Sequence, residues 1–191
     1  MNLQRQSKLN RKVNNGIHSD SENYYREEIY LPASSAYILT SLIIALTLNL
    51  FPLQQEFLIF RPDFVAITLI YWCVNESHKM GMSIAFIMGL MMDTGNTSIL
   101  GQHALAYCVA VYLALVLGRR LRIFNLMQQA PQVGLILFVM QAVIVLVAIA
   151  GGSSFPGWQY FSATVSGILL WAPIAVVISM PLKQKPDPDA L

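Results

Sequence analysis

Six apolar stretches separated by short polar turns constrain this chain more than any other feature. A helix needs about 20 apolar residues, each adding about 1.5 Å, to cross a hydrocarbon core of about 30 Å. The stretches cover residues 35–53, 62–74, 81–92, 99–117, 133–150 and 161–180. The first, fifth and sixth meet the required length, whereas the other three are short. We therefore expect an all-α membrane protein, a bundle of about six transmembrane helices.

The three short stretches leave alternatives open. The second becomes long enough if its helix continues through Asn75 to His78. The third and fourth form either two full spans or a re-entrant hairpin buried in protein. The turn between them, residues 93–98, reads D-T-G-N-T-S and is rich in turn formers. In both cases the pair begins and ends on the same side of the membrane.

The charge content agrees with a chain covered largely by lipid. Only 12% of the residues are charged, whereas soluble domains carry about 25%. Cys73 and Cys108 both lie in apolar runs and match no metal-binding or redox spacing, so we interpret them as small buried apolar residues.

The positions of the basic residues predict the topology. If the helices alternate in direction, one side of the membrane has Arg61 as its only basic residue. The other side receives Arg5, Lys8, Arg11, Lys12, Arg26, Lys79, Arg119, Arg120, Arg122, Lys183 and Lys185. Basic residues concentrate in cytoplasmic segments, so we expect both termini in the cytoplasm.

Polar segments flank the predicted bundle. Residues 1–33 have low hydrophobicity and mixed charge, and show no cleavable signal peptide. Residues 183–191 alternate proline with charge. Neither composition can form a core. We predict a disordered cytoplasmic leader at 1–33, a helix bundle at 34–182 and a disordered tail at 183–191.

Small residues recur at every fourth position in the third and fourth stretches, which lets helix backbones approach closely in lipid. They are Gly81, Ala85 and Gly89, and then Ala106, Ala110, Ala114 and Gly118. These stripes serve either packing within the bundle or docking of another protein's helix.

Charged residues mark the ends of several stretches. Arg61-Pro62-Asp63 opens the second, where proline and an acidic residue suit a first helical turn; alternatively, Arg61 makes a contact on the outer surface. Asp93 closes the third and either caps the following turn or forms a buried pair with Arg61.

A basic cluster follows the fourth stretch. Arg119, Arg120 and Arg122 either hold this loop near anionic lipid or meet an acidic patch on a cytoplasmic partner.

Enzyme signatures are missing. The three histidines, His18, His78 and His103, form no H-E-x-x-H motif. His103 has no second histidine, cysteine or acid at ligand spacing. No histidine follows the serine-elbow-like residues 151–154. We expect no catalytic, cofactor-binding or metal-binding residues, and no nucleic-acid partner.

Four segments in a fixed order carry a family resemblance. F-R-P-D-F at 60–64, Tyr71-Trp72, G-L-M-M-D at 89–93 and L-G-Q-H-A-L at 100–105 together resemble the bacterial rod shape-determining protein MreD family. The resemblance covers about residues 35–182 in helix order and is most specific between Arg61 and Leu105. The polar leader of about thirty residues departs from the family pattern.

The resemblance implies a non-enzymatic scaffold subunit of the cell-elongation complex in the inner membrane. Its partners would be an MreC-like single-helix protein, MreB filaments, peptidoglycan synthases and lipid. The family is distantly similar to the six-helix substrate-binding subunits of energy-coupling-factor vitamin transporters, so a small-molecule-binding transporter subunit is the alternative. Its candidate polar groups, Asn49, Asp93 and Gln141, are scattered along the sequence.

Overall fold

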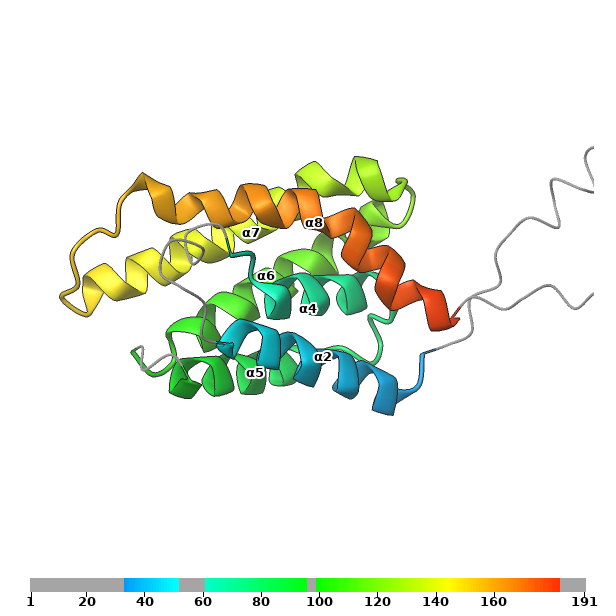
Figure 1. Ribbon diagram of the computed structural model, residues 1–191, viewed down its shortest axis with the longest axis horizontal. Coiled ribbons are helices and arrows are strands. Elements are labelled where there is room, and N and C mark those ends of the chain that lie inside the picture. Colours follow the sequence, from blue (N-terminus) through cyan, green and yellow to red (C-terminus); the bar gives the residue numbers. More distant parts are fainter. Residues whose placement is uncertain (1–32, 52–60, 96–98, 183–191) are drawn as a thin grey trace, which may run out of the picture. The chain divides into compact units, whose positions relative to one another are not determined.

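The computed structural model describes residues 33–51, 61–95 and 99–182, and the predicted disordered leader and tail lie almost entirely outside them. Within these residues the chain forms six α-helices, two short 3-10 helices and no strand (Figure 1). The α-helices are α2 (Ser35–Leu50), α4 (Phe64–Asn75), α5 (Met82–Gly95), α6 (Gln102–Leu121), α7 (Leu126–Ala150) and α8 (Ser162–Ser179). The 3-10 helices are η1 (Trp158–Phe161) and η2 (Met180–Leu182). Each predicted apolar stretch overlaps one α-helix, which confirms the number and order of the helices.

The predicted lengths of two helices were wrong. α2 was expected to be long enough to span, but it has 16 residues and stops at Leu50. The reason is Pro52, which disfavours helical backbone at the preceding residue, and Phe51 is indeed extended at φ −64° and ψ 125°. α6 was expected to be short, but it has 20 residues and runs past the apolar stretch through Arg119 and Arg120. Arginine is a good helix former, so the loss of hydrophobicity does not end the helix.

Three segments of the described chain are long and apolar enough to cross a membrane: α6, α7 and the segment Trp158–Leu182. The remaining helices have 16, 12 and 14 residues. The proposed extension of the second helix to His78 is wrong, because α4 ends at Asn75.

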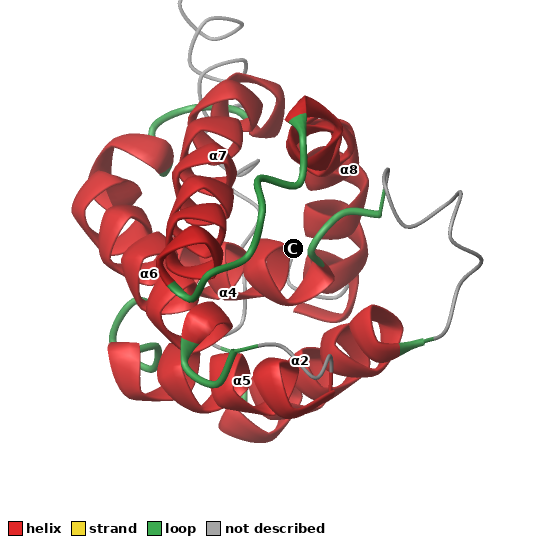
Figure 2. Ribbon diagram, turned by 90° about the vertical axis from the view of Figure 1, so that its left-hand side faces the viewer, coloured by secondary structure: helices red, strands yellow, loops and turns green. Residues whose placement is uncertain are grey.

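α4 lies at the centre of the bundle. It packs against α2, α6 and α8, and Figures 1 and 2 both show it between these neighbours. Ten of its twelve residues are buried. Because other helices cover α4, this short helix is shielded from lipid.

The outward surface of the bundle is apolar. Large aliphatic and aromatic side chains on five helices are about half exposed or more, among them Ile43, Phe86, Tyr112, Leu135 and Val165. Exposure of so many apolar side chains to water would be unfavourable, and soluble monomers rarely show it. Contact of the same side chains with lipid carries no such cost. The chain is therefore a membrane protein.

Candidate functional site

Asp63 joins three helices at one end of the bundle. Its Oδ1 accepts a hydrogen bond from the backbone N–H of Ala66 at 3.0 Å, so it caps the N-terminus of α4. The same Oδ1 accepts from the Asn49 side chain of α2 at 2.7 Å, and Oδ2 accepts from the Tyr107 hydroxyl of α6 at 2.8 Å. One carboxylate thus accepts a free N–H group of the first turn of α4 and connects α4 to α2 and α6.

Asn49 and Arg61 complete this junction. The Asn49 Oδ1 accepts a second N–H of α4, that of Phe64, at 3.0 Å. The Arg61 guanidinium donates to the carbonyl oxygens of Phe51, at 3.1 Å, and Leu48, so it caps the C-terminal end of α2. Partial burial lowers the pKa of Arg61, and the nearby Asp63 carboxylate raises it. The prediction that Asp63 lies within the first turn is wrong by one position, because α4 begins at Phe64 and Asp63 is its N-cap residue. Its carboxylate still lies at the helix N-terminus, where a negative charge is favourable.

Asp93 caps the start of α6 from the end of α5. Asp93 is 1% exposed. Oδ2 accepts from the backbone N–H of Gly101 at 2.8 Å, and Oδ1 accepts from the backbone N–H of His103 at 2.9 Å. Asp93 therefore acts as a cap, but its hydrogen bonds to the described residues serve the start of α6. Residues 96–98 of the predicted turn lie outside the described part of the chain.

The acidic partner of His103 was missed. Its Nδ1 lies 2.7 Å from Oδ1 of Asp93, whereas the predicted alternative paired Asp93 with Arg61, which binds the end of α2 instead. Ten residues separate the two side chains in sequence, and the reversal of the chain between α5 and α6 brings them together. The available signal was the turn-forming segment after Asp93, which predicts a chain reversal that returns the L-G-Q-H-A-L segment at 100–105 toward Asp93.

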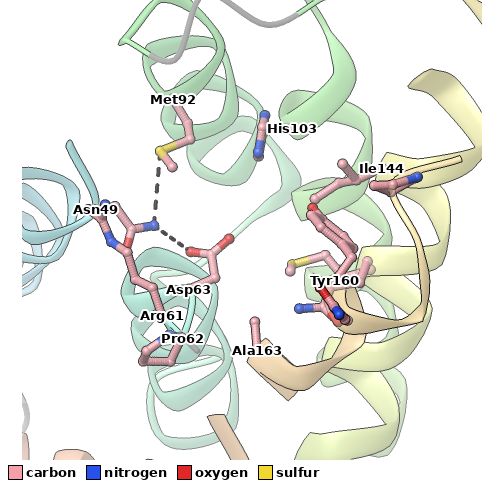
Figure 3. A pocket seen from close by; sticks show the side chains of 13 residues that line it. Asn49, Arg61, Pro62, Asp63, Met92, His103, Ile144, Tyr160 and Ala163 are labelled. Atoms are coloured by element: carbon pink, nitrogen blue, oxygen red, sulfur yellow. Dashed lines mark hydrogen bonds between the residues drawn. The ribbon is translucent and has the colours of Figure 1, made fainter. Parts of the chain in front are cut away.

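A cavity of about 530 Å³ lies beside these residues (Figure 3). We call it the Asp63 cavity. Its polar lining comes from Asn49, Arg61, Asp63, His103, Gln141, Gln159 and Tyr160, and its apolar lining from Pro62, Met92, Met140, Ile144, Pro156 and Ala163. The expectation that Asn49 and Gln141 are scattered is wrong, because they line one cavity from α2 and α7. Asp93 is connected to it through His103.

The small-residue stripes lie mostly inside the bundle. A Cβ atom built on Gly89 would come within 2.5 Å of the Ala104 backbone nitrogen, so α5 and α6 touch here. Ala85, Ala106, Ala110, Ala114 and Gly118 are also buried. Only Gly81 is partly open, with no atom within 4 Å of a built Cβ. This geometry favours internal packing over docking at these positions.

The basic cluster divides into two parts. Arg122 donates to the carbonyl oxygens of Val74 and Asn75, the latter at 3.3 Å, and so caps the C-terminal end of α4. Arg119 and Arg120 are exposed. Arg122 is exposed as well, but its guanidinium is engaged in these hydrogen bonds, whereas no hydrogen bond of the Arg119 or Arg120 side chain is seen among the described residues.

The chemistry that this arrangement offers is binding and helix positioning. No group of three or more histidine, cysteine, aspartate or glutamate side chains in the described ranges is placed to hold a metal ion. The carboxylate oxygens of Asp63 and Asp93 accept hydrogen bonds from backbone N–H groups at helix N-termini. Both carboxylates therefore stabilise helix ends.

Comparison with known proteins points to one family. The family described as rod shape-determining protein MreD matches residues 34–180. A protein of Haemophilus influenzae named rod shape-determining protein MreD is 30% identical over 134 residues, which cover 70% of this chain and 83% of that protein. No solved structure matches significantly.

Proposed function

Because this chain belongs to the rod shape-determining protein MreD family, we propose that it is a multi-pass, non-enzymatic scaffold in the inner membrane that binds an MreC-like protein. Through that partner it would help to couple MreB filaments to peptidoglycan synthases. Family membership supports the role in rod shape determination, and the partners are our proposal.

The observation that supports helix binding is a groove of about 330 Å³ between α2 and α8, with α4 as its floor. We call it the α2–α8 groove. It is lined by Tyr37, Thr40, Ser41, Ile44, Ala45, Leu48, Phe64, Thr68, Pro173, Ile174, Val177 and Ile178. The hydroxyls of Thr40, Ser41 and Thr68 donate to carbonyls of their own helices, so the groove presents mainly carbon to the lipid.

A single transmembrane helix is the partner that suits this groove. Small side chains such as Ser41 and Ala45 allow two backbones to approach closely, and close packing drives helix association in lipid. Large side chains at the rim, including Ile44 and Val177, are exposed and available for contact. The one membrane helix of an MreC-like protein has the required form. Arg119 and Arg120 remain available for a cytoplasmic partner of the same complex.

The first prediction tests the groove with a matched pair of substitutions. Val177→Trp places a bulky side chain at the groove, whereas Val116→Trp makes the same change on α6, outside it. The two valines are 63% and 61% exposed. We expect Val177→Trp to reduce recovery of the MreC-like protein in affinity capture from mild detergent by at least about tenfold, equivalent to about 1.4 kcal/mol. Val116→Trp should leave recovery unchanged.

Equal recovery with both variants would reject the α2–α8 groove as the docking site. Capture of the unsubstituted protein without any MreC-like protein would reject the scaffold proposal itself. Comparable amounts of both variants in the membrane fraction establish that insertion is unaffected.

A further inference from the structure

We propose that the Asp63 cavity binds a ligand carrying an organic ammonium group. The proposal concerns a small-molecule site and does not rest on the scaffold role. It follows from the charge, the free hydrogen-bonding groups and the size of the cavity.

Asp63 makes no salt bridge in the described part of the chain. Its three hydrogen-bond donors, on Ala66, Asn49 and Tyr107, are all neutral. Among the described residues, ion pairs form only at Glu76 and Asp93. The Arg61 guanidinium donates instead to the end of α2. Arg61 is close enough to interact electrostatically with Asp63 but is not hydrogen-bonded to it. A carboxylate that is partly removed from water and makes no salt bridge remains able to bind a further cation.

The opposite wall supplies further groups for such a cation. Figure 3 shows Tyr160 across the cavity from Asp63. The Tyr160 hydroxyl makes no hydrogen bond with the described residues, and a tyrosine ring can also attract a cation by its face. Gln141 is 4% exposed, and its Oε1 accepts from Thr164 at 2.5 Å. Its amide nitrogen has no partner in the described chain and can donate to a ligand oxygen.

The size and apolar lining favour an organic ion over a metal ion. A volume of about 530 Å³ falls within the range of about 300–1,000 Å³ typical of small-molecule sites. Met92, Met140 and Ile144 line part of the cavity and can contact a carbon skeleton. Two sources offer this chemistry: the ethanolamine headgroup of a phospholipid and a soluble organic amine.

The experiment measures thermal unfolding of the purified full-length protein in mild detergent. The probes are dihexanoyl phosphatidylethanolamine, phenethylammonium and, as a lipid without an ammonium group, dihexanoyl phosphatidylglycerol. We expect an ammonium probe to raise the unfolding midpoint in a saturable way, and the glycerol lipid to leave it unchanged. A response to the ethanolamine lipid alone identifies a lipid source, and a response to phenethylammonium identifies a soluble one.

Two acid-to-amide variants test the role of the charge. Asp63→Asn removes the charge but keeps an oxygen that caps α4, because asparagine caps as well as aspartate. Its apparent affinity for the effective probe should fall at least about tenfold, the worth of a hydrogen bond to a charged group. Glu76→Gln makes the same change outside the cavity and should bind like the unsubstituted protein.

A second pair of variants tests the same cavity if Asp63→Asn does not fold. Gln159→Lys places a competing ammonium group at the lining of the cavity, and Gln128→Lys places one on an exposed site of α7. Only Gln159→Lys should weaken binding. The proposal is overturned if neither ammonium probe shifts the midpoint, if the glycerol lipid shifts it equally, or if the Asp63 and Gln159 variants respond like the unsubstituted protein.

Discussion

Asp63 and Arg122 cap the two ends of α4, and their side chains carry opposite charges. Asp63 accepts an N–H at the N-terminus, and Arg122 donates to carbonyls at the C-terminus. This is the arrangement that the helix dipole favours. Asp93 at the start of α6 and Arg61 at the end of α2 follow the same rule. Charged residues are costly near membrane depth, and here each satisfies backbone groups that have no partner within their own helix.

At Gly89, the addition of a single methyl group is expected to destabilise the protein strongly. The Cβ position of Gly89 falls against the backbone of Ala104, and backbone cannot move aside as a flexible side chain can. We therefore predict that Gly89→Ala destabilises the protein by about 1–3 kcal/mol, the usual cost of overpacking, and lowers the midpoint of thermal unfolding in detergent.

Gly81→Ala is the control for this prediction. A Cβ atom at Gly81 meets nothing within 4 Å, so its midpoint should stay within error of the unsubstituted value. If Gly89→Ala behaves like Gly81→Ala, then α5 and α6 are not in contact at Gly89.

At the scale of elements, the caps explain why short helices are stable here. The C-terminal carbonyls of α4 are bound by Arg122, and Arg122 also donates to the Ser77 hydroxyl at 3.3 Å. The last carbonyls of any helix have no partner within that helix, and here a side chain that follows α6 supplies the donor.

Removing this cap should be measurable. We predict that Arg122→Ala lowers the free energy of unfolding by about 1 kcal/mol, because the part-buried carbonyl of Val74 loses a charged donor. Arg119→Ala removes an exposed arginine three residues earlier and should have almost no effect. Thermal unfolding of both variants in the same detergent compares them, and equal midpoints would contradict the capping role of Arg122.

The elements could be predicted from sequence better than their contacts. Apolar runs indicate where helices form because lipid leaves few other structures, and all six helices followed. The length of α2 was overestimated because Pro52 was read as part of the apolar run. The site was harder to predict, since Asn49, Asp63 and Tyr107 come from three helices and no spacing rule connects them. Asp93 and His103 meet only because α5 and α6 are antiparallel.

At the scale of the whole molecule, the distribution of basic residues predicts the orientation in the membrane. Arg61 lies beside the Asp63 cavity, near the N-terminus of α4. Lys79 lies between the C-terminus of α4 and the N-terminus of α5, and Arg122 donates to the C-terminus of α4, so both are at the other end of the bundle. If the positive-inside rule holds, the Asp63 cavity opens on the outer side of the membrane.

Cysteine labelling in intact cells tests this orientation. Ser154→Cys and Ser77→Cys each place a thiol at an exposed position, on opposite sides of the predicted bundle. We expect a membrane-impermeant maleimide to label Ser154→Cys in intact cells and Ser77→Cys only after permeabilisation. The unsubstituted protein, with Cys73 and Cys108, measures the background. The reverse pattern would invert the proposed topology.

The burial of α4 has a consequence for how the protein is made. With 12 residues, α4 is about 18 Å long, well short of the bilayer core of about 30 Å. An isolated segment of this length, with charged groups beyond both ends, partitions poorly into lipid. Because α2 is made before α4 and α6 after it, we expect α4 to enter the bilayer together with these neighbours, as an associated group of helices.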